Sequence, residues 1–163
     1  KNTKDGLQTV TAFGLLASVD TGYPVLLTEM TILTALRTAA TSAIATKYLA
    51  PQNARTLALI GNGAQSEFQA IALKKICDIK TVRLFDVDPA ATEKCRKNLS
   101  DSGLEIVTCA TAEEAVLGAE VITTCTADKQ YATILTDNMI GPASISMQSA
   151  GIVRVKLSFI ATS

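Results

Sequence analysis

Histidine and tryptophan are absent from this 163-residue chain, and aromatic residues make up only 4% of it. Without histidine, the chain cannot form a Ser-His-Asp or Cys-His catalytic arrangement. The scarcity of aromatic side chains argues against the stacking platforms that bind single-stranded nucleic acid. The formal net charge is zero, so no electrostatic feature predicts nucleic acid or an anionic membrane as a partner.

Cysteine is present but not in the spacing of a metal or redox site. Cys77, Cys95, Cys109 and Cys125 form no C-x-x-C pair, so with histidine absent we expect no metal site. Free cysteines in apolar segments behave as small hydrophobic residues, and we expect buried thiols in a reducing cytoplasm. No signal peptide and no apolar run long enough to span a bilayer is visible, which also predicts a cytoplasmic protein.

The first part of the chain has the pattern of a β-hairpin followed by a helix. A strand is predicted from Val10 to Val19, and its return strand begins at Pro24, after a turn that contains Gly22. Thr28 to Thr31 offers N-cap residues, and apolar residues then recur at helical spacing up to Ile44.

After Pro51 the pattern changes to strands that alternate with helices. This alternation predicts an α/β fold, a Rossmann-type parallel sheet with right-handed crossovers and helices on both faces. The expected strands are 56–60, 81–85, 104–109 and 121–125, and the expected helices are 64–75, 90–99 and 112–117.

The turn after the first of these strands reads Gly61-Asn-Gly-Ala-Gln-Ser66. A glycine-rich turn between a strand and a helix presents N–H groups and the positive helix end to a pyrophosphate. Gly61 permits the tight turn, Gly63 permits close approach of the phosphates, and Ser66 stands where the fingerprint has a third small residue. The alternative interpretation is an ordinary tight turn between a strand and a helix.

Asp86 ends the next strand, about twenty residues beyond the glycines, where the fingerprint places its acidic residue. A carboxylate there accepts hydrogen bonds from the adenosine ribose and repels a 2′-phosphate, so we expect NAD rather than NADP. Asp88 is the second candidate, although Pro89 after it favours a turn or helix cap. Arg37, in a helix of small and apolar residues, is either a structural residue or a partner for a carboxylate or phosphate.

Four segments together resemble the ornithine cyclodeaminase/mu-crystallin family, and within it the bacterial cyclodeaminases. They are Asp20-Thr-Gly-Tyr-Pro-Val-Leu-Leu27, Ala35-Leu-Arg-Thr-Ala-Ala-Thr41, Ile60-Gly-Asn-Gly-Ala-Gln-Ser-Glu-Phe-Gln69 and Thr126-Ala-Asp-Lys129. The resemblance implies that Arg37 contacts the substrate carboxylate and the cofactor. It implies further cofactor contacts at Thr9, Gly61, Gly63, Ala64, Gln65, Asp86 and Thr126.

The resemblance also implies a reaction, in which L-ornithine becomes L-proline and ammonia is released. Hydride leaves the α-carbon for NAD, the δ-amine attacks the resulting imine, ammonia departs, and the hydride returns to the cyclic imine. Full-length members are expected to be homodimers. The alternatives are a mu-crystallin-like nucleotide binder without catalysis and a ketimine reductase or amino-acid dehydrogenase of the same family.

Parts of the family's site are missing from the chain. The lysine and arginine that contact substrate are expected before Lys1, and the catalytic aspartate is expected in a segment after Pro142. The catalytic segment typical of the family can be written as DNA with suitable synonymous codons. When that DNA is read one base later, it encodes every residue from Ala143 to Ser163. We interpret this tail as a frameshifted catalytic segment and expect the chain as written to be inactive.

The expected organisation therefore has three parts. Residues 1–50 form part of a substrate and dimerisation domain, residues 51–142 form the NAD-binding Rossmann domain, and residues 143–163 are the frameshifted tail.

Overall fold

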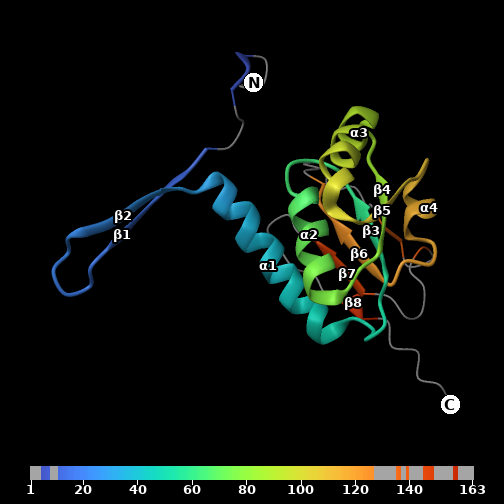
Figure 1. Cartoon of the computed structure of the whole chain (residues 1–163), viewed down its shortest axis with the longest axis horizontal. Coiled ribbons are helices and arrows are strands. Elements are labelled where there is room, and N and C mark those ends of the chain that lie inside the picture. The colour runs from blue at the N-terminus through green and yellow to red at the C-terminus, as the bar shows by residue number, and fades with distance from the viewer. Residues whose placement is uncertain are drawn as a thin grey trace. The chain divides into compact units, whose positions relative to one another are not determined.

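The structure, a computed structural model, describes residues 5–7, 11–126, 135–136, 139, 145–148 and 156–157. The chain forms two compact units, residues 1–37 and residues 38–163 (Figure 1). Within the described part of the chain, no helix has both the length and the apolar character needed to cross a membrane.

The first unit contains the expected hairpin. Strand β1 (Phe13–Ala17) pairs antiparallel with strand β2 (Pro24–Glu29), and Leu16 lies opposite Leu26. The turn closes with a hydrogen bond of 2.9 Å from the Gly22 N–H to the Ser18 carbonyl, and Gly22 has a positive φ of 72°. The predicted hairpin is confirmed, with strand ends that differ by a few residues.

Helix α1 (Thr31–Leu49) begins at the predicted N-cap region, Thr28 to Thr31. Thr28 lies inside β2 and does not cap the helix. Glu29 takes this role: its carboxylate accepts hydrogen bonds from the main-chain N–H groups of Thr31 and Ile32, the latter at 3.0 Å. Hydrogen bonding to the side chain of Thr31 and to the main chain of Ile32 lowers the pKa of Glu29 below its usual value.

The second unit contains the predicted parallel sheet. Its strand order is β5-β4-β3-β6-β7-β8, and all neighbouring pairs are parallel except β7 and β8. The strands are β3 (Thr56–Ile60), β4 (Thr81–Phe85), β5 (Glu105–Thr108), β6 (Val121–Thr124), β7 (Ile145–Gln148) and β8 (Lys156–Leu157). The helices are α2 (Ser66–Cys77), α3 (Pro89–Asn98) and α4 (Ala112–Val116), with a short 3-10 turn η2 (Ser100–Ser102).

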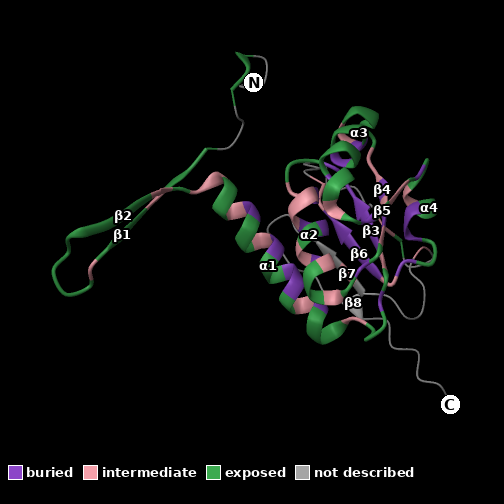
Figure 2. Cartoon of the chain, viewed as in Figure 1, coloured by how far each residue is buried: buried purple, intermediate pink, exposed green. Residues whose placement is uncertain are grey.

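Alternate side chains of β3 enter two separate cores. Leu57 and Leu59 pack with residues of α1, α2 and α3, whereas Ala58 and Ile60 pack with residues of α4. Because successive side chains of a strand point to opposite faces, helices cover both faces of the sheet (Figure 2). This confirms the predicted layering.

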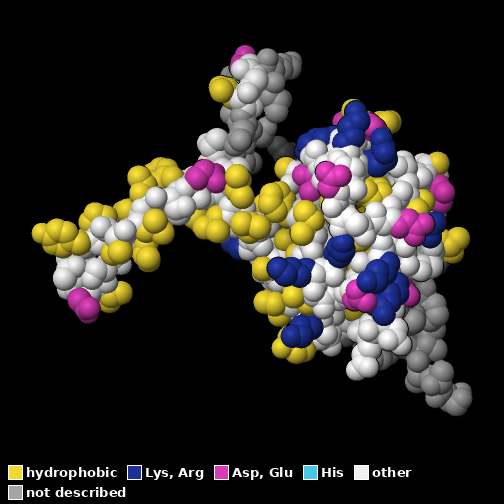
Figure 3. All heavy atoms as spheres, in the orientation of Figure 1, with side chains coloured by type: hydrophobic (Ala, Val, Ile, Leu, Met, Phe, Trp, Pro, Cys, Tyr) yellow, Lys and Arg dark blue, Asp and Glu magenta, His cyan; other side chains and the backbone are white. Residues whose placement is uncertain are grey.

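The hairpin of the first unit leaves large apolar side chains in solvent. Phe13 is 79% exposed and Leu27 is 70% exposed, and Leu15, Leu16 and Val25 are also more than half exposed. Figure 3 shows hydrophobic side chains along the whole hairpin. Soluble monomers rarely expose a continuous apolar patch of this kind. Such a patch is typical of a surface that another segment or subunit covers.

Candidate functional site

The turn between β3 and α2 is fixed by the end of β6. The Gly61 N–H donates to the Phe85 carbonyl at 2.8 Å, and the Cys125 N–H donates to the Ile60 carbonyl at 2.7 Å. Gly61 has a φ of +90°, and a Cβ atom there would lie 2.8 Å from Thr126 Cγ2 and from the Thr126 main-chain nitrogen. Both the backbone conformation and the close approach of Thr126 therefore require glycine at position 61.

Gly63 is a glycine for a different reason. Nothing lies within 4 Å of a Cβ built there, and its φ is not positive. The space above it is open, as close approach of a phosphate requires.

Helix α2 begins at Ser66, two residues beyond the predicted start at Ala64. The Ser66 hydroxyl donates to the Gly63 carbonyl at 2.7 Å, and this local turn delays the helix. Gln65 at the N-cap position makes no capping hydrogen bond with its side chain. Among the described residues, none accepts a hydrogen bond from the N–H groups of Gly63, Ala64 or Gln65. An uncapped helix N-terminus of this kind suits an anion such as a pyrophosphate.

Ser66 is fully buried where α2 meets α3, and its hydroxyl lies 3.4 Å from Cys95 Sγ. A larger side chain would separate the two helices, which explains the small residue at the third position of the fingerprint. Burial raises the pKa of the Cys95 thiol. Cys95 and Cys109 are buried, as predicted, whereas Cys77 and Cys125 are only half-buried.

Asp86 follows β4 and faces the glycine turn. Its Oδ2 accepts the Asn62 N–H at 2.5 Å, and its Oδ1 accepts the Asp88 N–H at 2.9 Å. The Asp88 side chain caps α3 by accepting the Ala90 N–H at 2.9 Å. The preference for Asp88 as a helix cap is thus confirmed, and Asp86 is the carboxylate beside the turn.

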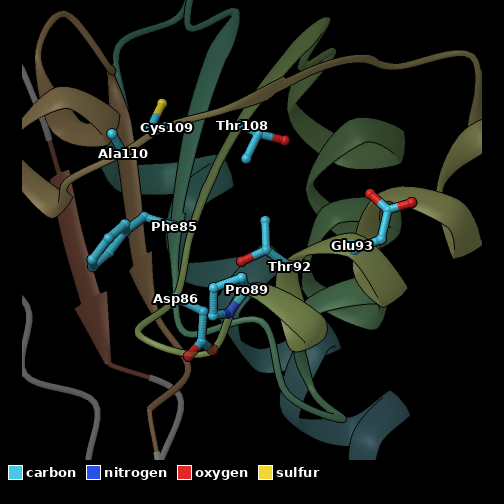
Figure 4. Close-up of a pocket in the computed structure, with 8 residues that line it drawn as sticks. All are labelled: Phe85, Asp86, Pro89, Thr92, Glu93, Thr108, Cys109 and Ala110. Atoms are coloured by element: carbon cyan, nitrogen blue, oxygen red, sulfur yellow. The ribbon is translucent and has the colours of Figure 1, made fainter.

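A cavity of about 220 Å³ opens beside Asp86 (Figure 4). It lies at the carboxyl ends of β4 and β5 and at the first turn of α3. Its lining residues are Phe85, Asp86, Pro89, Thr92, Glu93, Thr108, Cys109 and Ala110. Of these residues, only Asp86 was predicted from the sequence as a ligand contact. The predicted parallel order could have indicated Thr108, because parallel strands bring their carboxyl ends to one edge of the sheet.

The remaining predicted residues fall into three groups. Thr126 is half-buried against Gly61, while Ala64 and Gln65 lie in the turn itself. Arg37 is exposed on α1, at the end of the first unit. Thr9 lies outside the described residues. The structure thus brings together the glycine turn, Asp86 and Thr126, and the contacts predicted for them stay predictions.

Comparison with known proteins identifies the family. The model of the ornithine cyclodeaminase/mu-crystallin family matches residues 1–152. Ornithine cyclodeaminase of Brucella suis is 66% identical over 151 residues, which are 93% of this chain and 42% of that protein. The chain thus spans less than half the length of the curated relatives it matches.

Solved structures of similar fold agree with the sequence match. The Δ1-pyrroline-2-carboxylate reductase of Thermococcus litoralis, in complex with NADH and L-proline, has a TM-score of 0.85 and 32% identity. That match covers 90% of this chain and 45% of the reductase chain. An archaeal alanine dehydrogenase dimer with bound NAD has a TM-score of 0.79 and 33% identity, over 88% of this chain and 43% of that chain. The chain therefore belongs to the ornithine cyclodeaminase/mu-crystallin family.

Proposed function

We propose that residues 51–142 bind NAD, with the pyrophosphate over the glycine turn and the adenosine in the cavity. The observation that carries this proposal is the position of the Asp86 carboxylate, held against the turn by the Asn62 N–H at 2.5 Å and beside the cavity. The open space at Gly63 and the uncapped start of α2 fit a pyrophosphate. The relatives solved with NADH and NAD support the same ligand.

Each residue of the site then has a defined task. The N–H groups of Gly63, Ala64 and Gln65 would bind the phosphates. Gln65 Oε1, a buried oxygen to which no described residue donates, would accept from a ligand hydroxyl or water. Asp86 would accept from the adenosine ribose hydroxyls, and its charge would repel the 2′-phosphate of NADP. Thr126 would contact the cofactor from the end of β6.

For the whole protein we propose conversion of L-ornithine to L-proline with release of ammonia. NAD, when bound, supplies hydride acceptance and return. Arg37 would hold the substrate carboxylate, because a guanidinium pairs with a carboxylate through two hydrogen bonds. The 66% identity to ornithine cyclodeaminase favours this reaction over the alternatives, since the reductase of Bacillus cereus and the alanine dehydrogenase of Archaeoglobus fulgidus are 35% and 38% identical.

We also propose that residues 1–50 belong to a second domain, which binds substrate and forms a homodimer. The exposed apolar side chains of the hairpin support this, since they need a covering surface. The archaeal alanine dehydrogenase relative is a dimer.

Ligand selectivity tests the cofactor proposal. Changing Asp86 to Ser removes the carboxylate that would repel a 2′-phosphate, so the ratio of NADP to NAD dissociation constants should fall by about tenfold or more, equivalent to 1.4 kcal/mol. Titration calorimetry of the chain and the variant with both nucleotides measures the ratio. An unchanged ratio would show that Asp86 is not the ribose carboxylate.

The reaction is tested by ammonia release from L-ornithine in the presence of NAD. We expect this chain to give no turnover, because residues 143–163 contain no carboxylate where the family resemblance places the catalytic aspartate, whereas the ornithine cyclodeaminase of Brucella suis should be active under the same conditions. Loss of one acid–base group alone costs about 10²- to 10⁴-fold. Comparable turnover by the two proteins would refute both the frameshift and the assignment of the catalytic segment.

A further inference from the structure

Asn62, between the two glycines of the turn, makes contacts that the dinucleotide fingerprint does not specify. Its side chain is fully buried, and its Nδ2 donates to Thr92 Oγ1 at 3.0 Å. Thr92 is 6% exposed, lies in the first half of α3 and lines the cavity. Figure 4 shows Thr92 with Pro89 and Asp86 around the start of α3. The glycine turn is therefore tied to the helix that forms one wall of the cavity.

The main chain of the same residue holds Asp86. The Asn62 N–H donates to Asp86 Oδ2 at 2.5 Å, while the other carboxylate oxygen accepts the Asp88 N–H at 2.9 Å. Asp88 in turn caps α3. The turn, the carboxylate and the start of α3 are thus linked by hydrogen bonds, in which Asn62 contacts Asp86 through its main chain and Thr92 through its side chain.

We infer that Asn62 and Thr92 are positioning residues, which set the orientation of the Asp86 carboxylate and so determine the preference for NAD over NADP. This inference rests on the proposed binding of NAD in the site. Both side chains are neutral, so they act on the ligand through the orientation of Asp86. Their hydrogen bond fixes residue 62, and residue 62 fixes Asp86.

The energetics argue against a purely structural role for Asn62. Its Oδ1 is buried and has no hydrogen-bond partner among the described residues. Leaving a buried polar atom unpaired costs about 1–3 kcal/mol, whereas an apolar side chain at the same place would avoid that cost. A residue with such a cost is typical of a functional site, where orientation matters more than stability. The unpaired Oδ1 is also free to accept a hydrogen bond when a ligand or water enters.

The experiment compares Thr92→Val, which keeps the volume and removes the hydroxyl, with Thr92→Ser, which keeps the hydroxyl. Asn62→Ala, which keeps the main-chain N–H, completes the set. A neutral hydrogen bond contributes about 0.5–1.5 kcal/mol, so Thr92→Val and Asn62→Ala should each weaken NAD binding by about 2- to 12-fold. Thr92→Ser should stay within about twofold of the parent chain.

Three further measurements distinguish a positioning role from general destabilisation of the protein. NADP binding should weaken less than NAD binding, because NADP gains little from the oriented carboxylate. The double variant Asn62→Ala/Thr92→Val should be no weaker than either single variant, since both remove one interaction. Without any ligand, NMR should show faster amide exchange at residue 62 in Thr92→Val and unchanged exchange in Thr92→Ser.

The outcomes are distinguishable. If the parent chain binds neither nucleotide, the proposed NAD site fails, and this inference fails with it. If the parent binds NAD but the variants weaken both nucleotides equally, act additively, or leave amide exchange at residue 62 unchanged, only the positioning role is overturned.

Discussion

The two glycines of the turn lead to a specific prediction, because substitution by alanine should have a different effect at each position. In Gly61→Ala the new methyl group would meet Thr126 and the Cys125 carbonyl carbon at 2.8–2.9 Å, in a backbone conformation with a φ of +90°. In Gly63→Ala the methyl group would meet no atom within 4 Å, and the backbone is not in the left-handed region. The first change should affect folding, and the second should affect binding.

The magnitude for Gly61→Ala has two parts. A left-handed conformation costs a residue with a Cβ about 1–2 kcal/mol. Overlap with main-chain atoms, which cannot rotate away, adds about 1–3 kcal/mol, as overpacking does in a core. The total of about 2–5 kcal/mol is a large share of the 5–15 kcal/mol that typically stabilises a domain. At about 2–4 °C per kcal/mol, the melting temperature should fall by roughly 4–20 °C.

For Gly63→Ala the melting temperature should change little, because exposed substitutions away from special features usually stay within about 0.5 kcal/mol. The methyl group would, however, occupy the space through which the pyrophosphate approaches, so NAD binding should weaken by about tenfold or more. Thermal unfolding of both variants without ligand, and calorimetric titration with NAD, provide the test. If Gly63→Ala binds NAD as the parent does, the phosphate does not lie over this turn. If Gly61→Ala is as stable as the parent, β6 does not constrain the turn as described.

Two further predictions concern carboxylates outside the turn. Glu29→Gln should speed amide exchange at the start of α1, because a neutral amide is a weaker acceptor for the Thr31 and Ile32 N–H groups. The control variant Thr28→Ala should leave this exchange unchanged. Equal effects of the two variants would contradict the assignment of Glu29 as the cap. Hydrogen bonding to Arg96 lowers the pKa of Glu93 from 4.5 to about 2, so its stabilising contribution should be present above pH 4.5 and be lost as the pH falls toward 2. An NMR titration of the Glu93 carboxyl should show this low pKa, and Arg96→Gln should raise it; a midpoint near 4.5 in the unmodified chain would contradict the pairing.

The central strands could be predicted from the sequence because their signals are local. The apolar segments Thr56–Ile60 and Thr81–Phe85 have turn residues on both sides, and β3 and β4 occupy these residues. The details of the helix starts depend on single side-chain contacts. Glu29 is the residue of the predicted cap region that binds the start of α1, and the contact of Ser66 with the Gly63 carbonyl accompanies the later start of α2.

The cavity could not be predicted because its lining depends on non-local pairing. Thr92 and Thr108 are distant from each other in sequence, and the order of the strands and the crossover of α3 bring both to the cavity. No strand was predicted at Ile145–Gln148, which lies in the segment interpreted as a frameshifted tail. In the structure this strand pairs in parallel with β6. Short segments of alternating polarity can adopt a strand whether or not they were selected for it.

The contact between Gly61 and Thr126 connects the two ends of the predicted cofactor site. Family resemblance selected both residues separately as cofactor contacts, but the structure shows that each limits the position of the other. Thr126 directly follows the last hydrogen bond between β6 and β3, where the Cys125 N–H donates to the Ile60 carbonyl at 2.7 Å. Any shift of β6 would therefore move the glycine turn, and with it Asn62 and the Asp86 carboxylate that Asn62 holds.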